Sequence, residues 1–323
     1  MESKREKSIV GTETPTTVMD KAAFQTPILL ILFNRPEMAE RVFERIRAVH
    51  PSKLFFACDG PRKDHPGEWE RMRQSRALAS AVDWECEVKT RFLDTNTGCR
   101  SAVPSAISWF FSEVEEGIVF EEDCLPDPTF FRFCGEMLER YRDDKRIMNI
   151  SGVNSLLSKP KLSESYYFSR YPHIWGWATW RRAWHCYSPQ MEDFPDFVRS
   201  GALSATFPDR TERKRWTEIL EKVYRGDPAF NTWDAQWSYA HFKNHALSIT
   251  PRHNLVINIG CTPDAMHTAD SPFARIPAIP MEFPLCHPNF IVPNMKLDAE
   301  TFREDYANPF HRRLGRWLAR KLH

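Results

Sequence analysis

The chain has 323 residues, of which 42% are hydrophobic and 27% are charged, values that are ordinary for a globular protein with a substantial core. Its formal net charge is +1, so no bulk field attracts nucleic acid, and we expect no nucleic-acid partner. The eight cysteines are scattered without a C-x-x-C pair, which argues against a zinc site and against a disulfide scaffold.

The beginning of the chain is polar and lacks the apolar core of a signal peptide, so we interpret residues 1–25 as a mobile leader. The apolar run that follows, TPILLILF, is much shorter than the roughly 20 residues that a membrane-spanning helix needs. We therefore expect a cytoplasmic protein.

Residues 26–152 alternate between short apolar runs and amphipathic helical patterns. This alternation is typical of right-handed β-α-β units and predicts a mainly parallel sheet. We therefore predict an α/β, Rossmann-like fold with helices flanking the sheet. The predicted strands are 28–34, 53–60, 87–94, 117–123 and 146–152, and the predicted helices are 36–50, 66–81, 101–114 and 128–144.

Polar residues stand at the carboxyl ends of four predicted strands, where open α/β sheets bind their ligands. One such residue is common at the start of any loop, but four groups on a single edge of the sheet predict a ligand site. The groups are Asn34 with Arg35, Asp59 with Gly60, Asp94 with Asn96, and Glu121 with Glu122 and Asp123.

The acidic triplet Glu121–Glu122–Asp123 ends the strand GIVFEED. In an extended strand, Glu121 and Asp123 point to one side and Glu122 points to the other. Crowded carboxylates repel one another unless a cation neutralises them, and oxygen ligands suit Mn²⁺ or Mg²⁺, which also bind phosphates. We expect the two prolines of CLPDP to turn the chain and so to fix Asp123. A solvated acidic turn explains the triplet equally well.

After residue 152 the composition changes, because seven of the eleven tryptophans fall between residues 175 and 237. No Pro-, Gly- or Ser-rich linker marks the change, so we predict a tryptophan-rich lobe packed on the first half and not an independent domain. Its predicted helices are 192–200, 209–225 and 232–245, and an extended stretch follows at 246–260.

Residues 271–323 are predicted to be an irregular, proline-rich wrapping segment that ends in a basic amphipathic helix. In residues 311–323, Leu and Trp side chains share one helical face, and Arg and Lys occupy the rest. Such a helix is typical of a membrane surface, and equally of a terminal helix docked on its own protein. The first interpretation predicts peripheral association with the inner face of the membrane.

The string apolar-apolar-Glu-Glu-Asp-x-x-Pro-x-Pro-x-Phe-Phe resembles the metal-binding acidic motif of GT-A-fold glycosyltransferases. It is particularly similar to the N-acetylglucosaminyltransferase I type and to related bacterial sugar transferases, although the family's motif is Glu-Asp-Asp. The similarity spans residues 26–268 in collinear order and predicts a GT-A-like fold. The other stretches that carry it are ILLILFNRP, LFFACDG, YPHIWGWATWRRAW and FNTWDAQW.

The resemblance implies a metal-dependent, inverting glycosyltransferase that moves a sugar such as GlcNAc from a UDP-sugar to a hydroxyl of a glycan or lipid-linked glycan. Residues 26–152 would then bind the nucleotide sugar, and residues 153–270 would form the acceptor and catalytic lobe. Asp123 would bind Mn²⁺ or Mg²⁺, and Asp234 would be the catalytic base.

The predicted substrate-binding residues have distinct roles. By resemblance, Arg35 contacts the nucleotide, Asp59 recognises uracil, Trp233 stacks on the donor sugar, and His267 lies on a loop that covers the donor. Arg100 stands where a helix begins and backbone N–H groups favour a phosphate. The full set is Arg35, Asp59, Arg100, Glu121, Glu122, Trp233 and His267.

A purely structural interpretation competes with three of these roles. Asp234 is well placed to cap a helix, Trp233 has the spacing to Trp237 of a core residue, and Asp59 beside Gly60 is typical of a turn. Two other functions also compete. A sugar nucleotidyltransferase usually has a glycine- and arginine-rich first loop, which ILFNRPEMAE lacks. A non-catalytic carbohydrate-binding protein would leave the acidic strand end unexplained.

Overall fold

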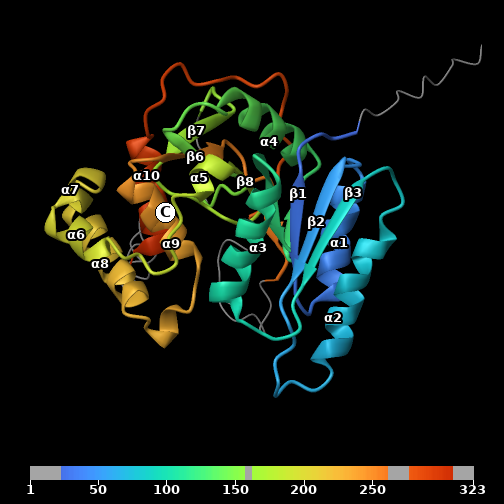
Figure 1. The fold of residues 1–323 in the computed structure, drawn as a ribbon. Coiled ribbons are helices and arrows are strands. Elements are labelled where there is room, and N and C mark those ends of the chain that lie inside the picture. Colours follow the sequence, from blue (N-terminus) through green and yellow to red (C-terminus); the bar gives the residue numbers. More distant parts are fainter. Residues whose placement is uncertain (1–22, 157–161, 261–275, 308–323) are drawn as a thin grey trace, which may run out of the picture.

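The computed structural model describes residues 23–156, 162–260 and 276–307. An eight-stranded sheet, in the order β3-β2-β1-β4-β8-β6-β9-β7, forms the centre of the molecule, with helices on both faces (Figure 1). Neighbouring strands are parallel in four pairs and antiparallel in three. The predicted α/β fold with a mainly parallel sheet is therefore confirmed.

The first half of the sheet follows the predicted alternation, and each predicted strand and helix of residues 26–152 is present. Most elements end a few residues earlier than the sequence pattern suggests, because the polar strand ends belong to the connecting loops. The elements are β1 (Ile28–Leu32), α1 (Pro36–Arg47), β2 (Lys53–Cys58), α2 (Glu68–Ala77), β3 (Glu87–Phe92), α3 (Cys99–Glu113), β4 (Glu116–Glu121), α4 (Thr129–Arg140) and β6 (Ile147–Ser151).

The segment CLPDP differs from its prediction, because it does not form the turn itself. Cys124–Pro126 is a short strand, β5, that pairs antiparallel with β10 (Val256–Asn258). The turn lies one step earlier, at Glu122 and Asp123. The pairing with β10, and not a proline turn, therefore holds the end of the acidic triplet in place.

A second difference concerns the order of the strands. β8 (Trp177–Trp180) enters antiparallel between β4 and β6, so these two predicted strands are not neighbours. β9 (Leu247–Pro251) and β7 (Tyr166–Ser169) complete the sheet on the same side. The C-terminal half thus supplies strands to the same sheet as the N-terminal half.

The side chains of β1 alternate between two cores, as expected for a central strand buried on both faces. Ile28, Leu30 and Leu32 pack in the core that α1, α2 and α4 cover. Leu29 and Ile31 pack in the opposite core, with α3, α5 (Arg181–Trp184) and α9 (Asp234–Lys243). Because β1 pairs parallel with both β2 and β4, the loops after these three strands meet at one edge, beside the beginnings of α1 and α3.

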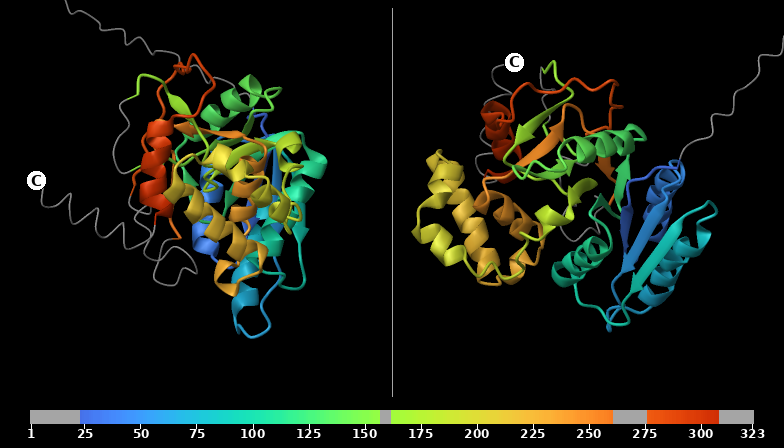
Figure 2. Two further views of the ribbon diagram at one scale, coloured as in Figure 1. Left: turned by 90° about the vertical axis from the view of Figure 1, so that its left-hand side faces the viewer. Right: turned by 45° about the horizontal axis from the view of Figure 1, so that its top comes forward.

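Three helices, α6 (Phe194–Arg199), α7 (Ala202–Thr206) and α8 (Arg210–Tyr224), form the helical lobe of the second half. They pack on α9 around Trp216 and Tyr239 in a core of their own. Figures 1 and 2 show this lobe beside the sheet, away from β3. The helices predicted at 192–200, 209–225 and 232–245 are thus confirmed as α6, α8 and α9.

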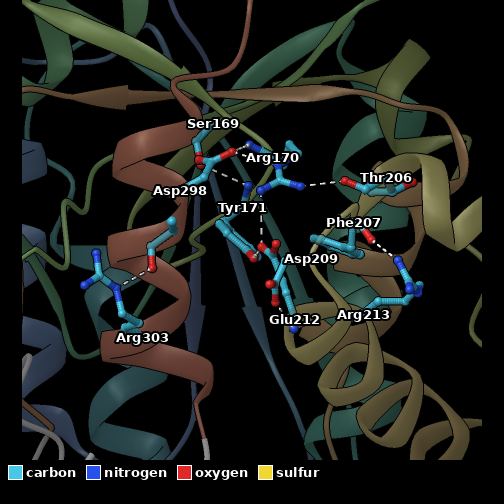
Figure 3. A network of polar contacts seen from close by, with 11 residues as sticks. Ser169, Arg170, Tyr171, Thr206, Phe207, Asp209, Glu212, Arg213, Asp298 and Arg303 are labelled. Atoms are coloured by element: carbon cyan, nitrogen blue, oxygen red, sulfur yellow. Dashed lines mark hydrogen bonds and ion pairs between the residues drawn. The ribbon is translucent and has the colours of Figure 1, made fainter. Parts of the chain in front are cut away.

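A buried polar network around Arg170 joins this lobe to the sheet (Figure 3). The Arg170 Nε donates to Asp298 Oδ2 at 2.9 Å, and its Nη2 donates to Glu212 Oε1 at 3.2 Å. The hydroxyl of Ser169 donates to Asp298, and that of Tyr171 donates to Glu212. Because Asp298 lies on α10 (Met295–Thr301) and Glu212 on α8, one guanidinium fastens two distant helices to the end of β7.

None of the helices in the described ranges is long and apolar enough to cross a membrane. Residues 1–22 and 308–323, which hold most of the predicted leader and the whole predicted basic helix, lie outside those ranges.

Candidate functional site

Two neighbouring acidic side chains and a third that is distant in the sequence interact at the carboxyl end of β4. Glu121 ends β4, Asp123 follows in the turn, and Asp234 is the first residue of α9. Burial, and then the negative charges of Asp123, Asp234 and Glu122, raise the pKa of Glu121 to about 8. Arg35 acts in the opposite direction. The edge therefore carries more negative than positive charge.

Arg35 immediately precedes α1 and pairs with Asp123, its Nη1 donating to Oδ2 at 2.9 Å. The backbone N–H of Ile259 donates to the Asp123 carbonyl at 2.8 Å. Gly260 packs against the pair so closely that a Cβ there would lie 2.2 Å from Asp123 Oδ2 and 2.7 Å from Arg35 Nη1. A larger residue at that position would displace the Arg35–Asp123 pair, so Gly260 lets the backbone approach Asp123 closely.

Glu122 is buried in the turn after β4 and bonds to the loop that follows β1. Its Oε2 accepts a hydrogen bond from the backbone N–H of Phe33 at 2.6 Å. Burial raises its pKa to about 7, while the bond from Phe33 and the charge of Arg35 act against the rise. Glu122 therefore braces the end of β1 against the end of β4, and its predicted contact with substrate stays a prediction.

Asp59 is buried after β2 and is surrounded by hydrogen-bond donors of its own chain. The backbone N–H groups of Gly60, Thr97 and Gly98 donate to its carboxylate at 2.8–3.1 Å, as do the side chains of Asn96 and Thr97. A carboxylate offers about four lone-pair sites, so these donors occupy it. Asp59 thus holds the loop that begins α3, and a bond to uracil would require one of these donors to be exchanged.

Asp234 has one oxygen engaged within its own turn. Its Oδ1 accepts from the hydroxyl of Thr232 and from the backbone N–H of Ala235, the latter at 3.0 Å. Within the described ranges, no hydrogen bond reaches its Oδ2. Asp234 is the first residue of α9 and not its cap, because the cap position belongs to Trp233. One oxygen thus orients the carboxylate and the other can take a proton.

Trp233 lies in the core. Its side chain is 3% exposed, and the rings of Trp177 and Trp184 pack on it with centroids 6.1 and 6.4 Å away. The predicted stacking on a donor sugar would require the indole to leave this cluster. In the described conformation Trp233 is therefore a core residue in the same buried cluster as Trp237, as its spacing to Trp237 indicates.

Arg100 stands at the beginning of α3, where its Nη2 donates to the carbonyl of Val223 at 3.2 Å. It thereby bridges α3 and the end of α8, and it also lines a groove along α3. The predicted contact with a phosphate stays a prediction. His267, the other predicted ligand contact, lies outside the described residues.

The carboxyl end of β4, where Glu121, Asp123 and Asp234 lie, is called the acidic edge below. The acidic triplet that it contains was predicted as a divalent-cation site. Among the described residues, no group of three or more His, Cys, Asp and Glu side chains is arranged to hold a metal. The side chains that are present nevertheless suit a hard cation, because Glu121 and Asp123 offer only oxygen atoms, and a bound cation would favour the ionised form of Glu121. Asp123 would be the anchoring ligand and would need further oxygen ligands from a bound phosphate.

Sequence reasoning missed three residues of this site. Cys99 is a half-buried thiol at the beginning of α3, and burial together with Glu121, Asp234, Asp59 and Asp123 raises its pKa to about 12, which disfavours the thiolate form. Gly260 and Tyr187 meet the site only through tertiary contacts. Gly260 had one signal, because a glycine that ends an extended stretch often marks a close approach of backbone.

The raised pKa of Glu121 predicts a pH-dependent stability. Its contribution is fully present below the ordinary value of 4.5 and is lost as the pH rises through about 8, because the folded state holds the proton more tightly. We expect the free energy of unfolding in EDTA to fall by about 1 kcal/mol between pH 7 and pH 9. Chemical denaturation should show a flatter profile for Glu121→Gln.

Glu116→Gln is the matched control for this experiment. Glu116 begins the same strand and pairs with Arg142 on the surface, so the variant should keep the wild-type slope. An unchanged slope in Glu121→Gln would contradict the crowding of carboxylates at the acidic edge.

Comparisons with known proteins add little to this site. No family model matches the chain, and no curated protein sequence matches it. Among solved structures, one similar chain is that of a UDP-glucose pyrophosphorylase complexed with UDP-glucose, with 10% sequence identity and a TM-score of 0.26. The match covers 45% of this chain and 62% of that one. A similarity at this level carries no argument, so the fold class depends on the sheet described above.

Proposed function

We propose that this chain is an inverting glycosyltransferase that moves a sugar, such as GlcNAc, from a UDP-sugar to a hydroxyl group of a glycan or lipid-linked glycan. The observation that carries the proposal is the gathering of Glu121, Asp123 and Asp234 with Arg35 at the carboxyl end of β4. This is the edge of an α/β sheet at which ligands bind. The motif resemblance of the same residues to GT-A-fold glycosyltransferases supports it.

The donor would lie with its diphosphate between Arg35 and the acidic residues. Arg35 offers guanidinium N–H groups that suit phosphate oxygens, and its exposed fraction of 28% leaves part of it accessible. A divalent ion bound by Asp123 and the diphosphate, Mn²⁺ or Mg²⁺, would supply positive charge to the leaving group. The chain's own task at this end is to orient Asp123, which Arg35 and Gly260 do.

The transfer step requires a base for the acceptor hydroxyl, and Asp234 is the proposed one. The hydroxyl oxygen forms a bond to the anomeric carbon from the face opposite the diphosphate, while the bond to the diphosphate oxygen breaks and its electron pair leaves with the diphosphate. The hydroxyl proton passes to Asp234 Oδ2. Attack from the opposite face inverts the anomeric configuration.

Donor binding tests this proposal directly. Thermal unfolding of the whole chain would be followed with UDP-GlcNAc, UDP-glucose and UDP, each with Mn²⁺ or with EDTA. A ligand that binds only the native state raises the melting temperature, by an amount that grows with its concentration relative to its dissociation constant. We expect stabilisation by UDP-sugar that depends on Mn²⁺ and is lost in Asp123→Asn.

Asp127→Asn is the matched control, because Asp127 lies four residues further on and bonds to Thr129 outside the acidic edge. It should keep the Mn²⁺-dependent shift. If no nucleotide sugar raises the melting temperature in either buffer, the proposed function is wrong.

A further inference from the structure

A groove of about 920 Å³ runs along the exposed side of α3. One wall is formed by α3 itself, and the other by α5 and the segment 185–190 that follows it. Since α3 rises by 1.5 Å per residue, the lining from Arg100 to Ser112 is about 18 Å long. Figure 1 shows α3 beside the sheet with α5 near the end of α3 that lies away from the β3–α3 loop. The groove is thus larger than a single sugar ring requires.

The chemistry of the walls suits a polyhydroxyl chain. The floor contains the buried Trp184, whose Nε1 donates to the hydroxyl of Ser108 at 3.0 Å, and Tyr187 stacks on Trp184 with ring centroids 4.5 Å apart. Ser101 and Ser112 offer exposed hydroxyl groups from α3, and Gln190 offers an amide from the facing wall. Hydroxyl groups and an amide that donate and accept hydrogen bonds, beside the half-buried ring of Tyr187, are groups that bind sugars.

The charges of the groove do not exclude acidic sugars. Among the described residues that line it, none is acidic, whereas Arg100, Arg181 and His185 are basic. Arg181 donates to the carbonyl of Val114 at 3.1 Å and pairs with the exposed Glu115, so it closes the far end of the groove. Arg100 stands at the opposite end.

That opposite end adjoins the acidic edge. The Tyr187 hydroxyl donates to the carbonyl of Trp233 at 3.3 Å, one residue before Asp234. Arg100 follows Cys99, and the charges of Glu121 and Asp234 contribute to the raised pKa of the Cys99 thiol. A chain whose terminal hydroxyl lay at Asp234 would therefore have its remaining sugar units within reach of the groove.

We infer that this groove binds the acceptor as an extended oligosaccharide of several units, with the reacting end at Asp234 and the distal units along Ser101–Ser112. The direction of the bound oligosaccharide rests on the proposed function, because that function places the reacting end at Asp234. Oligosaccharide binding in the groove does not depend on the proposed function. It predicts an enzyme that prefers long acceptors to single sugars.

Ser112→Trp is designed to fill the far end of the groove without touching the acidic edge. Its matched control is Glu113→Trp, because Glu113 is also exposed on α3 but does not line the groove. The whole chain would first be applied to a glycan array, and the strongest oligosaccharide would then be titrated without donor by calorimetry, beside its one- and two-unit fragments.

We expect the oligosaccharide to bind at least tenfold more tightly than its two-unit fragment, and Ser112→Trp to remove that difference while Glu113→Trp keeps it. Equal affinities of the two variants, or no oligosaccharide binding on the array, would overturn the inference. The calorimetry contains no donor, so it tests the groove separately from the proposed function. If the oligosaccharide binds in the groove but no UDP-sugar binds the protein, only the proposed function is wrong. Transfer with equal KM for long and short acceptors would disprove the groove alone.

Discussion

Replacing Asp234 with Asn is expected to reduce the kcat of sugar transfer by about a hundredfold to ten-thousandfold, the range typical of a lost general base. The substitution is nearly isosteric, and the amide oxygen can still accept from Thr232 and Ala235, so the beginning of α9 should be preserved. What changes is the second oxygen, which becomes an NH₂ group that cannot take the acceptor proton.

The measurement is steady-state transfer from UDP-sugar at saturating acceptor, with UDP-sugar affinity determined separately by calorimetry. Donor affinity should stay within about twofold of wild type, because Asp234 is not proposed to contact the diphosphate. Asp227→Asn is the matched control: Asp227 accepts from the backbone N–H of Ala229 in a similar local turn, away from the acidic edge. Its kcat should be unchanged.

A turnover of Asp234→Asn close to that of wild type would remove Asp234 as the base. A parallel loss of donor affinity and melting temperature would instead indicate that Asp234 only holds the beginning of α9. The two results are distinguishable, because the first leaves the protein's stability untouched.

The fold and the position of the candidate site were largely predictable because both depend on local patterns. The run ILLILF must be a strand buried on both faces, and the apolar spacing in residues 36–47 can bury only one side of a helix. Once strands and helices alternate, their carboxyl ends share an edge. The polar residues that end the strands, Arg35 and Asp123 among them, were therefore predicted at one place.

The roles of individual residues were less predictable, because they depend on partners that are distant in the sequence. Asp59 is occupied by donors from residues 96–98, and Trp233 is covered by Trp177, more than fifty residues away. The place of β8 between β4 and β6 is likewise invisible in the local pattern. The prolines of CLPDP indicated a turn, but pairing with β10 outweighed them.

Replacing Arg170 with Met is expected to reduce the free energy of unfolding by about 3–5 kcal/mol, because it leaves two buried carboxylates without their cation. Arg170 is 8% exposed, Glu212 5% and Asp298 0%. Burial already raises the pKa of Glu212 and of Asp298, and Arg170 acts against the rise. Without the guanidinium both pKa values should rise further.

This pKa rise makes the loss of stability depend on pH. A carboxyl group whose pKa is raised in the folded state contributes most stability below its ordinary pKa, and it loses that contribution as the pH rises. Urea denaturation should therefore show a larger deficit for Arg170→Met at pH 8 than at pH 5. Arg303→Met is the matched control, because Arg303 is exposed and donates only to the carbonyl of Ala299 among the bonds shown in Figure 3.

The control should change the free energy of unfolding by no more than about 0.5 kcal/mol. Adding Glu212→Gln and Asp298→Asn to Arg170→Met should recover part of the loss, because no unpaired charge then remains buried. If Arg170→Met and Arg303→Met are equally stable at both pH values, the network in Figure 3 does not hold the helical lobe and α10 to the sheet. Recovery in the triple variant would instead show that the two unpaired carboxylates, and not lost packing, cause the loss of unfolding free energy in Arg170→Met.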